Sequence, residues 1–344
     1  MKKQIGTTGL LVFCMAMMCA CSNEVNELQN NEPVELKISP TLTMTRGVVS
    51  GTDATKIPDG IKVYAKGTGY GATPTIYTYS SSWSSVTPIY LSNSAATIYG
   101  FHPTDATFVA ATPAIEVSTI PGADDDASTI TVASDNTASV NALANEKDYL
   151  WAKASSTVTN ASNVATLDFN HGMAMVSFRL YKKDYVGEGK LTKIVLKNGG
   201  SGSVLTKPGT SGKATMSLEN GTITITSGEA VTYIRKTKTQ GSEHYVLKEA
   251  SQTESTTATS PAFSLMVYPV ATIAADNIKA EFEIDGKTYT IDLFQSTGTN
   301  NAAQWDAGKN YIYSIVMNGK GLGVTITLQG WSSQSIGGNG FNLV

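Results

Sequence analysis

The feature that most limits the fold of this chain is a series of short apolar runs with strand periodicity, separated by serine- and glycine-rich turns. In Val34-Glu-Leu-Lys-Ile38, apolar and charged residues alternate strictly, which is the pattern of a strand with one buried face. The only run with helical character is short, around residues 139–146. The pattern predicts an all-β protein. Further strands are expected at 60–66, 75–79, 95–102, 129–133, 166–181, 193–197, 279–284, 287–293, 311–317 and 322–328.

The spacing of the turns predicts β-sandwiches. Asp285-Gly286 separates two alternating runs, and this pair tolerates the positive φ angles of a tight hairpin turn. A length of 344 residues gives room for one large or two average domains. We therefore expect two antiparallel β-sandwich domains, at 47–165 and 166–344. Within 166–181 the parity of the apolar residues changes, which predicts a β-bulge near Gly172.

Composition and motifs exclude several classes of function. The chain has 25 Lys and Arg against 28 Asp and Glu, a formal net charge of −3, which is not that of a nucleic-acid binder. The three histidines are far apart in the sequence, and HExxH, P-loop and GxSxG motifs are absent. All three cysteines lie within the first 21 residues. We therefore expect no enzyme activity, no metal site and no cofactor.

The N-terminus has the pattern of an export signal. Lys2 and Lys3 precede an apolar run at 10–21, which is shorter than the roughly 20 residues that span a bilayer. Residues 1–20 therefore read as a cleaved signal peptide. The cysteine directly after Ala20 resembles the cleavage motif of bacterial lipoproteins, in which this cysteine is lipidated and becomes the first residue. That resemblance implies lipidation of Cys21; the alternative is an ordinary secretory signal with incidental cysteines.

The segment 21–46 combines a polar, acidic tether with the first expected strand. Val34, Leu36 and Ile38 supply the apolar face of that strand. Arg46 follows it, between Thr45 and Gly47. Small neighbours and a linker position indicate a site accessible to an arginine-specific protease, and the alternative is an ordinary loop arginine.

Isolated residues give weaker signals. His171 lies within an apolar strand, so we expect a core or edge histidine bonded to a backbone carbonyl rather than a ligand or general base. The acidic run at 124–126 lacks calcium-loop spacing and is expected to be a solvated loop. Four tryptophans could form a sugar-stacking platform, but burial in the core is the default expectation. They are Trp83, Trp151, Trp305 and Trp331.

A set of segments with a characteristic order extends over most of the chain. It consists of the signal ending at Cys21, the Thr-Arg pair at 45–46, Tyr99-Gly-Phe-His-Pro103, Asp148-Tyr-Leu-Trp-Ala152, Asp168-Phe-Asn-His-Gly-Met-Ala-Met-Val-Ser-Phe178, and the run from Trp305-Asp-Ala-Gly-Lys-Asn-Tyr-Ile-Tyr313 to Gln329-Gly-Trp331. By the order and spacing of these segments, the sequence resembles the fimbrillins, the type V pilins of anaerobic Gram-negative gut and oral bacteria.

The resemblance implies two transthyretin-like β-sandwich domains and a structural pilus subunit for adhesion, without catalysis or cofactor. It implies export as an acylated (palmitate-carrying) lipoprotein anchored through Cys21 at the outer membrane. An arginine-specific protease would cut between Arg46 and Gly47 and release the first strand. The exposed edge would then accept a C-terminal strand from another pilin subunit, because an incoming strand restores both the backbone ladder and the apolar contacts.

Two segments are alternatives for the donor strand. Leu322, Val324, Ile326 and Leu328 alternate cleanly, but this strand is also expected within the domain's own sheet. The tail carries Phe341 and Leu343, but glycines interrupt it, which weakens it as a strand. The role of the subunit stays open between stalk, tip or accessory subunit, and an anchor that is never cut. The alternative function is a surface lipoprotein that binds glycans through its β-sandwich domains.

Overall fold

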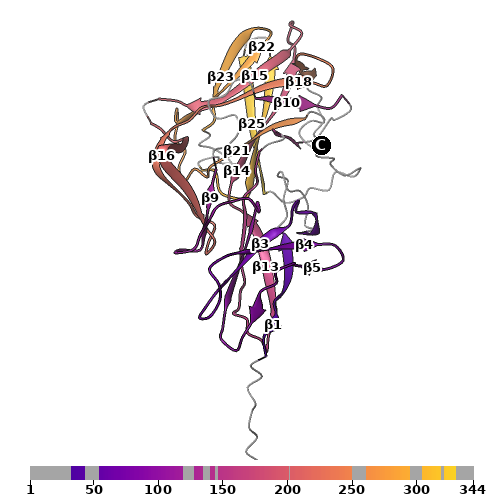
Figure 1. The fold of residues 1–344 in the computed structure, drawn as a ribbon. Coiled ribbons are helices and arrows are strands. Elements are labelled where there is room, and N and C mark those ends of the chain that lie inside the picture. Colours follow the sequence, from indigo (N-terminus) through magenta and orange to yellow (C-terminus); the bar gives the residue numbers. More distant parts are fainter. Residues whose placement is uncertain are drawn as a thin grey trace, which may run out of the picture.

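The computed structural model describes residues 32–42, 54–118, 128–134, 140–143, 146–200, 202–249, 261–294, 304–318 and 321–330. Figure 1 shows an elongated molecule with a lower lobe, drawn mainly in indigo and purple, and an upper lobe, drawn mainly in pink, orange and yellow. In these described ranges the regular structure is β, apart from a single turn of 3-10 helix, η1 (Ala54–Lys56). The predicted all-β class is confirmed.

The lower lobe is built on a seven-stranded sheet with the strand order β2-β13-β12-β7-β3-β4-β5. Its central strands are buried on both faces. On β7, Ile98 belongs to one core cluster, whereas Tyr99 and Phe101 on the opposite face belong to the other. A two-stranded pair, β1-β6, lies beside this sheet. The bounds are β1 (Val34–Glu35), β2 (Lys37–Leu42), β3 (Ile61–Lys66), β4 (Thr75–Tyr79), β5 (Trp83–Ser84), β6 (Tyr90–Leu91), β7 (Thr97–His102), β12 (Leu150–Lys153) and β13 (Val164–His171).

The upper lobe is a sandwich of two sheets. One has the order β10-β18-β15-β22-β23, with β19 on β15; the other has the order β11-β21-β14-β24-β25, with β20 on β14. Phe178 of β14 meets Phe282 of β22 edge to face, 5.4 Å between ring centroids, so the two sheets share one core. The bounds are β10 (Thr129–Val132), β11 (Val140–Asn141), β14 (Ala174–Lys183), β15 (Lys190–Asn198), β18 (Tyr233–Thr239), β19 (Tyr245–Val246), β20 (Lys248–Glu249), β21 (Ala262–Val267), β22 (Ile278–Ile284), β23 (Lys287–Asp292), β24 (Lys309–Asn318) and β25 (Gly321–Gly330).

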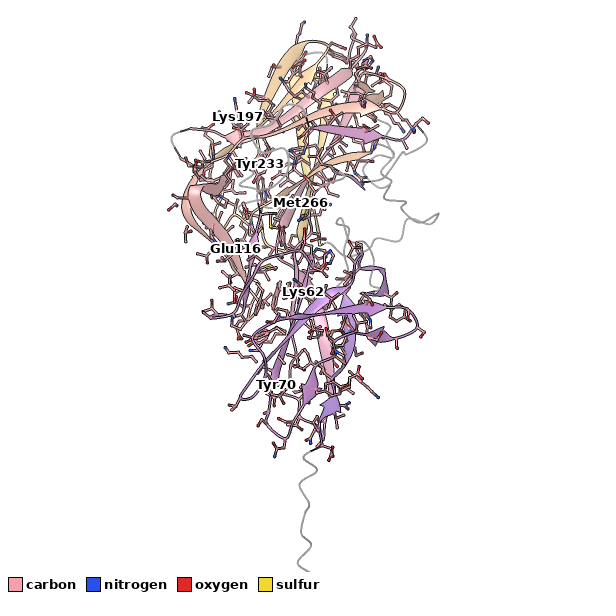
Figure 2. The ribbon with its side chains drawn as sticks, viewed as in Figure 1. Lys62, Tyr70, Glu116, Lys197, Tyr233 and Met266 are labelled. Atoms are coloured by element: carbon pink, nitrogen blue, oxygen red, sulfur yellow. The ribbon has the colours of Figure 1, made fainter. Side chains whose placement is uncertain are left out.

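A four-stranded sheet, β17-β16-β9-β8, lies between the lobes. Phe108 of β8 packs on Tyr64 and Phe101 of the seven-stranded sheet, with ring centroids 4.7 and 5.8 Å apart. In Figure 2 the labelled Glu116 of β9 marks this level of the molecule, below Met266 of the upper sandwich. The bounds are β8 (Phe108–Val109), β9 (Ala114–Val117), β16 (Thr206–Ser217) and β17 (Ile223–Ala230).

Strands on either side of residue 165 share sheets. The early strands β10 and β11 pair in parallel with β18 and β21 of the upper sandwich. Conversely, β13 extends past residue 165 within the lower sheet. The expected division at that residue therefore stays a prediction, and the chain crosses between the lobes on both sides of it.

Two local predictions were wrong. The run at 166–181 is not one bulged strand: β13 ends at His171, and β14 begins in another sheet at Ala174. Gly172 lies in this crossing, where an added Cβ would stand 2.1 Å from the Met216 sulfur. The expected helix at 139–146 contains the strand β11 instead, because pairing with β21 outweighs the weak helix preference of so short a segment.

The predicted hairpin is confirmed. β22 and β23 pair antiparallel, with Ile284 opposite Lys287. Asp285 and Gly286 have φ angles of 49° and 73°, as a tight two-residue turn requires. The Asp285 carboxylate also accepts hydrogen bonds from the backbone N–H groups of Gly189 and Lys190, both 2.9 Å, which fastens the turn to the start of β15.

Candidate functional site

The first strand of the described chain lies at an edge of the lower lobe. β2 pairs in parallel with β13, with Lys37 opposite Val164 and Leu42 opposite Phe169. Just before it, β1 pairs antiparallel with β6. β2 also approaches β5, the far edge of the same seven-stranded sheet. The segment 34–42 therefore contacts both ends of the strand order of this sheet, in the lower lobe of Figure 1.

Three aliphatic side chains fix this segment in the core. Leu36, Ile38 and Leu42 are 1%, 8% and 4% exposed, whereas the intervening side chains of β2 point to solvent apart from the half-buried Pro40. We call the space that these three side chains fill the first-strand slot. The same core cluster contains Ile61, Val63, Tyr77, Leu91, Leu167 and Phe169.

The backbone of the first strand has two distinct edges. The Lys37 N–H donates to the Asn163 carbonyl on the β13 side, 2.8 Å, while the Leu36 N–H donates to the Ile89 carbonyl on the opposite side, 2.8 Å. Pro40 has the same parity as Leu36, so its missing N–H lies on the side away from the β13 ladder. Proline is therefore tolerated in this strand without loss of a ladder hydrogen bond.

Side chains from the lower lobe hold the backbone of the first strand. Asn163 Nδ2 donates to the Glu35 carbonyl, 2.7 Å, and Asn160 Nδ2 donates to the Glu32 carbonyl, 3.2 Å. The buried Tyr77 hydroxyl donates to the Leu36 carbonyl, 3.4 Å. Burial raises the pKa of Tyr77, so this hydroxyl remains a donor. All three hydrogen bonds are donated to backbone carbonyl groups, so they do not depend on the side chains of the first strand.

One side chain of the first strand makes a polar contact with its neighbour. The Thr41 hydroxyl donates to the Asp168 carboxylate of β13. Thr41 and Asp168 are opposite each other in the ladder, and both side chains are exposed. This contact therefore lies on the solvent-exposed face of the β2–β13 pair. It favours the observed register of the two strands and buries no charge.

A glycine beneath the slot allows close packing. A Cβ on Gly100 of β7 would stand 2.6 Å from Phe169 Cζ and 3.2 Å from Leu167 Cδ1. Only a residue without a side chain lets these two slot residues lie flat on β7. The sequence analysis did not single out Gly100, although its position inside an apolar strand is a signal of close approach.

The two donor candidates differ in what the structure describes. Leu322, Val324, Ile326 and Leu328 belong to β25, which pairs antiparallel with β24 and is the edge strand of its sheet. Several other predicted site residues lie outside the described residues. They are Cys21, Arg46, Gly47, the 124–126 acidic run, Trp331, Phe341 and Leu343.

The arginines of the chain are unequally accessible. The sequence contains three, Arg46, Arg179 and Arg235. Arg179 lies in β14 and Arg235 in β18, and their side chains are 6% and 0% exposed. Both are therefore shielded from a protease in the folded protein.

The segment at 146–149 connects the lobes through side chains. Glu146 pairs with Arg235, 2.6 Å between Oε1 and Nη2, and burial raises the pKa of Glu146 to about 7 against the opposing effect of Arg235. Asp148 Oδ1 lies 2.7 Å from His171 Nδ1. His171 is buried as expected, and the Asp148 carboxylate is a partner that the sequence did not indicate. Both groups belong to a structural junction between the lobes.

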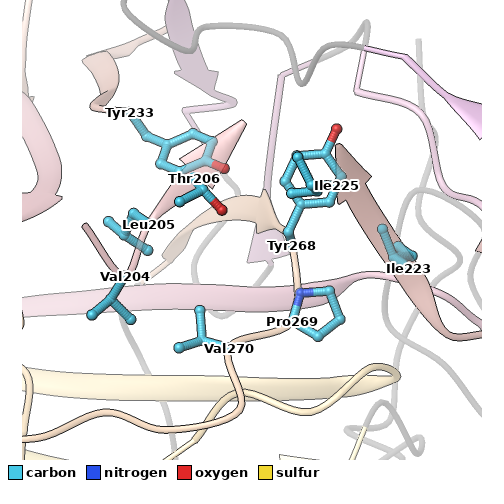
Figure 3. A pocket seen from close by; sticks show the side chains of 9 residues that line it. All are labelled: Val204, Leu205, Thr206, Ile223, Ile225, Tyr233, Tyr268, Pro269 and Val270. Carbon is cyan, nitrogen blue, oxygen red and sulfur yellow. The ribbon is translucent and has the colours of Figure 1, made fainter. Parts of the chain in front are cut away.

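One cavity away from the first strand is small. Figure 3 shows a cavity of about 50 Å³ between the four-stranded sheet and the upper sandwich, which is room for little more than water. Its lining is mostly apolar: Val204, Leu205, Thr206, Ile223, Ile225, Tyr233, Tyr268, Pro269 and Val270. Trp305 is fully buried and Trp83 and Trp151 are half-buried. Within the described ranges, no three His, Cys, Asp or Glu side chains gather as a metal site would require, and no helix is long and apolar enough to span a membrane.

Comparison with solved structures shows the fold. A fimbrial protein from Bacteroides vulgatus is 16% identical, with a TM-score of 0.51 over 86% of this chain and 100% of that one. Candidate cell adhesion proteins from Bacteroides uniformis and Bacteroides ovatus are each 14% identical. Their TM-scores are 0.53 and 0.54, over 87% and 88% of this chain and 99% and 100% of theirs.

Comparison with sequences shows the family. No curated protein sequence matches this chain. The sequence profile of the fimbrillin-like family, in contrast, matches residues 45–331. This match includes nearly all of the lower sheet, the sheet between the lobes and the whole upper sandwich. The chain belongs to the fimbrillin-like family.

Proposed function

We propose that this protein is a structural subunit of a fimbria, which assembles with other subunits by exchange of its first strand. The observation that carries the proposal is the placement of residues 34–42. They form an edge strand whose Leu36, Ile38 and Leu42 side chains complete the core of the lower lobe. Family membership and the fimbrial and adhesion descriptions of the similar structures support the same role at the cell surface.

Release of the first strand would create the surface that assembly needs. The strand ends at Leu42, four residues before Arg46. A cut after Arg46 leaves residues 34–42 held by non-covalent contacts alone. Their departure would expose the unpaired edge of β13 and an apolar slot, and both would be covered again by a strand from another subunit. The donor candidates are Leu322–Leu328 and the tail with Phe341 and Leu343.

The distribution of arginines favours a single processing site. Because Arg179 and Arg235 lie buried within strands, Arg46 is the one arginine of the sequence that is not enclosed in a described strand. An arginine-specific protease would therefore cut the folded precursor once. Before that cut, lipidation at Cys21 would hold the exported precursor on the outer membrane, since two or more acyl chains anchor a protein stably. The proposal assigns the protein no catalytic role and no cofactor.

Limited digestion tests this proposal. The lipid-free precursor, starting at Ser22, is treated with an arginine-specific protease and examined by N-terminal sequencing and on an unboiled denaturing gel. We expect one cut, a new N-terminus at Gly47, and a ladder of oligomers that disappears on boiling. The matched control is Arg46→Lys, which keeps the positive charge and should give neither cut nor ladder. A fully cut sample that remains monomeric would refute self-assembly by strand exchange.

A further inference from the structure

We propose that the hairpin of β4 and β5 carries a binding surface for uncharged glycan chains, centred on the side chains of Tyr79 and Trp83. We call these two side chains the aromatic pair. This inference goes beyond the proposed function and does not rest on strand exchange. It follows from the exposure of the aromatic pair, the way its rings are fixed, the hydroxyl groups beside them and the lack of charge in this part of the chain.

The aromatic pair lies next to the turn of the hairpin. Tyr79 of β4 and Trp83 of β5 are opposite each other in the ladder, with ring centroids 5.8 Å apart and ring planes tilted by 57°. Tyr79 is 44% exposed and Trp83 is half-buried. β5 is at the end of the strand order of the seven-stranded sheet, and Figure 1 shows it at the side of the lower lobe. Both rings are therefore within reach of a ligand in solvent.

The fold holds these rings in place. Trp83 packs against the core cluster of the lower lobe, and Tyr79 has the same parity as the fully buried Tyr77 of the same strand. The turn between the two rings has three residues, and the Ser80 N–H donates to the Ser82 carbonyl, 3.3 Å, across it. A ligand that stacks on these rings does not have to order them first, which lowers the entropy cost of binding.

Hydroxyl groups surround the aromatic pair. The sequence from Tyr79 to Ser85 is Tyr-Ser-Ser-Ser-Trp-Ser-Ser. Ser80, Ser81 and Ser82 are exposed, and a serine hydroxyl both donates and accepts hydrogen bonds. Aromatic rings offer apolar contact area to the C–H faces of a sugar ring, and the serines offer partners for its hydroxyl groups. A glycan presents these two chemistries together.

The hairpin lies within an uncharged part of the chain. No Asp, Glu, Lys or Arg occurs between Lys66 and Asp105, although charged residues make up 15% of the whole sequence. Lys62 of β3 pairs with Ile76 of β4, whose side chain points to the face opposite that of Tyr79. A charged ligand would find no counter-charge on the hairpin, and complementary charge is what selects such ligands. The surface therefore favours neutral glycans over acidic ones.

The other tryptophans with a described position are occupied by the fold. Trp305 is fully buried, and its indole N–H donates to the Tyr313 hydroxyl, 3.1 Å. Trp151 lies against the turn between β16 and β17, where a Cβ on Gly221 would stand 2.1 Å from the indole nitrogen. Within the described ranges, Trp83 is therefore the tryptophan whose ring pairs with an exposed aromatic side chain.

The size of the surface also favours a glycan over a protein partner. The hairpin consists of a strand of five residues and a strand of two. A specific protein interface covers about 800 Å² on each partner, which is more than a hairpin of this length supplies. Two neighbouring rings suit successive units of a sugar chain instead.

Affinity electrophoresis tests the proposal. The lipid-free chain that starts at Ser22 carries Arg46→Lys, so that it stays uncut, and it migrates through native gels with or without a polysaccharide. Amylopectin, galactomannan, xyloglucan and mixed-linkage β-glucan are the neutral probes, and heparin and polygalacturonate are the anionic ones. We expect retardation by at least one neutral probe. Tyr79→Ala should weaken it about tenfold, the loss expected for one aromatic contact. Trp83→Phe keeps an aromatic ring against the core and should weaken it less.

A variant on the other face of the same hairpin is the matched control. Thr78 and Ser84 are opposite each other and exposed, and they point away from the aromatic pair. Thr78→Ala with Ser84→Ala should leave the retardation unchanged. Urea unfolding of each variant separates loss of binding from loss of folding.

Three results would overturn the proposal. They are equal retardation of the parent chain and Tyr79→Ala, retardation by the anionic probes alone, and retardation by none of the four neutral probes. Because the chain stays uncut, each of these results leaves assembly by strand exchange untouched.

Discussion

The strength with which the first strand is held can be measured after the cut at Arg46. Burying the Leu36, Ile38 and Leu42 side chains contributes about 1.5–3 kcal/mol each before the opposing entropy. Leu36 is the most deeply buried of the three, at 1% exposed. Leu36→Ala should therefore cost about 2–5 kcal/mol, the usual range for a buried leucine. Since about 1.4 kcal/mol corresponds to a tenfold change in affinity, the cut strand should bind about 30-fold to 4,000-fold more weakly.

The assay uses the single thiol of a lipid-free chain that begins at Cys21. A dye on Cys21 reports, through fluorescence anisotropy, the release of the 21–46 fragment when excess unlabelled fragment is added. Lys37→Ala is the control, because this neighbouring side chain is exposed. It should change affinity by about twofold at most, as for surface substitutions of about 0.5 kcal/mol. Equal affinities of the Leu36→Ala and Lys37→Ala fragments would refute the assignment of Leu36 as an anchor of the first strand.

Three further predictions concern the body of the protein. Gly100→Ala should destabilise the protein by about 1–3 kcal/mol in urea unfolding, because the added Cβ meets Phe169 and Leu167. Gly71→Ala, at a position with open space around it, should change the stability little, and equal losses for the two variants would contradict the packing argument. At a pH above 7, Glu146→Leu should lower the free energy of unfolding by about 3–5 kcal/mol, because it leaves the buried Arg235 without its carboxylate. Adding Arg235→Met should recover most of this stability, and no recovery would mean that the pair is not the cause. Burial lowers the pKa of His102 below 6.5, so the unfolded chain takes up a proton at a higher pH than the folded protein does, and stability should fall as the pH drops below 6.5. His102→Asn should flatten this dependence of stability on pH, and an unchanged slope would contradict the argument.

Local sequence patterns predicted the strands that alternate or form local hairpins. β3, β4 and the β22–β23 hairpin fall where apolar alternation and the Asp-Gly pair placed them. β16 was not predicted, because Pro208, Gly209 and Gly212 interrupt it and its pairing with β17 shifts register there. β10 lies where a strand was expected, at 129–133, whereas β11 was missed because its partner strand β21 is more than a hundred residues away and tertiary contacts decide its structure.

The apolar contacts of the candidate site could be predicted from the sequence. The alternation at 34–38 indicated the buried face, and Leu36 and Ile38 lie there. Its polar half depends on contacts over long sequence separations: Asn160 and Asn163 bind carbonyls 128 residues earlier in the chain. The partner of His171 was missed for a related reason, since Asp148 reaches it only through the pairing of β12 with β13.

The continuity of β13 with β14 has a mechanical consequence for a fibre. The strand that borders the slot passes through Gly172 and Met173 into β14, and nine residue pairs join β14 in parallel to β24, which leads into β25. Tension between a slot at one end and a donated strand at the other would pull β14 and β24 in opposite directions along their axes. All rungs of that ladder would then be loaded together in shear, instead of being peeled one by one. Most of the force would pass through the backbone of β13 and β14, the β14–β24 hydrogen bonds and the backbone of β24. The loops on either side would carry little of the force.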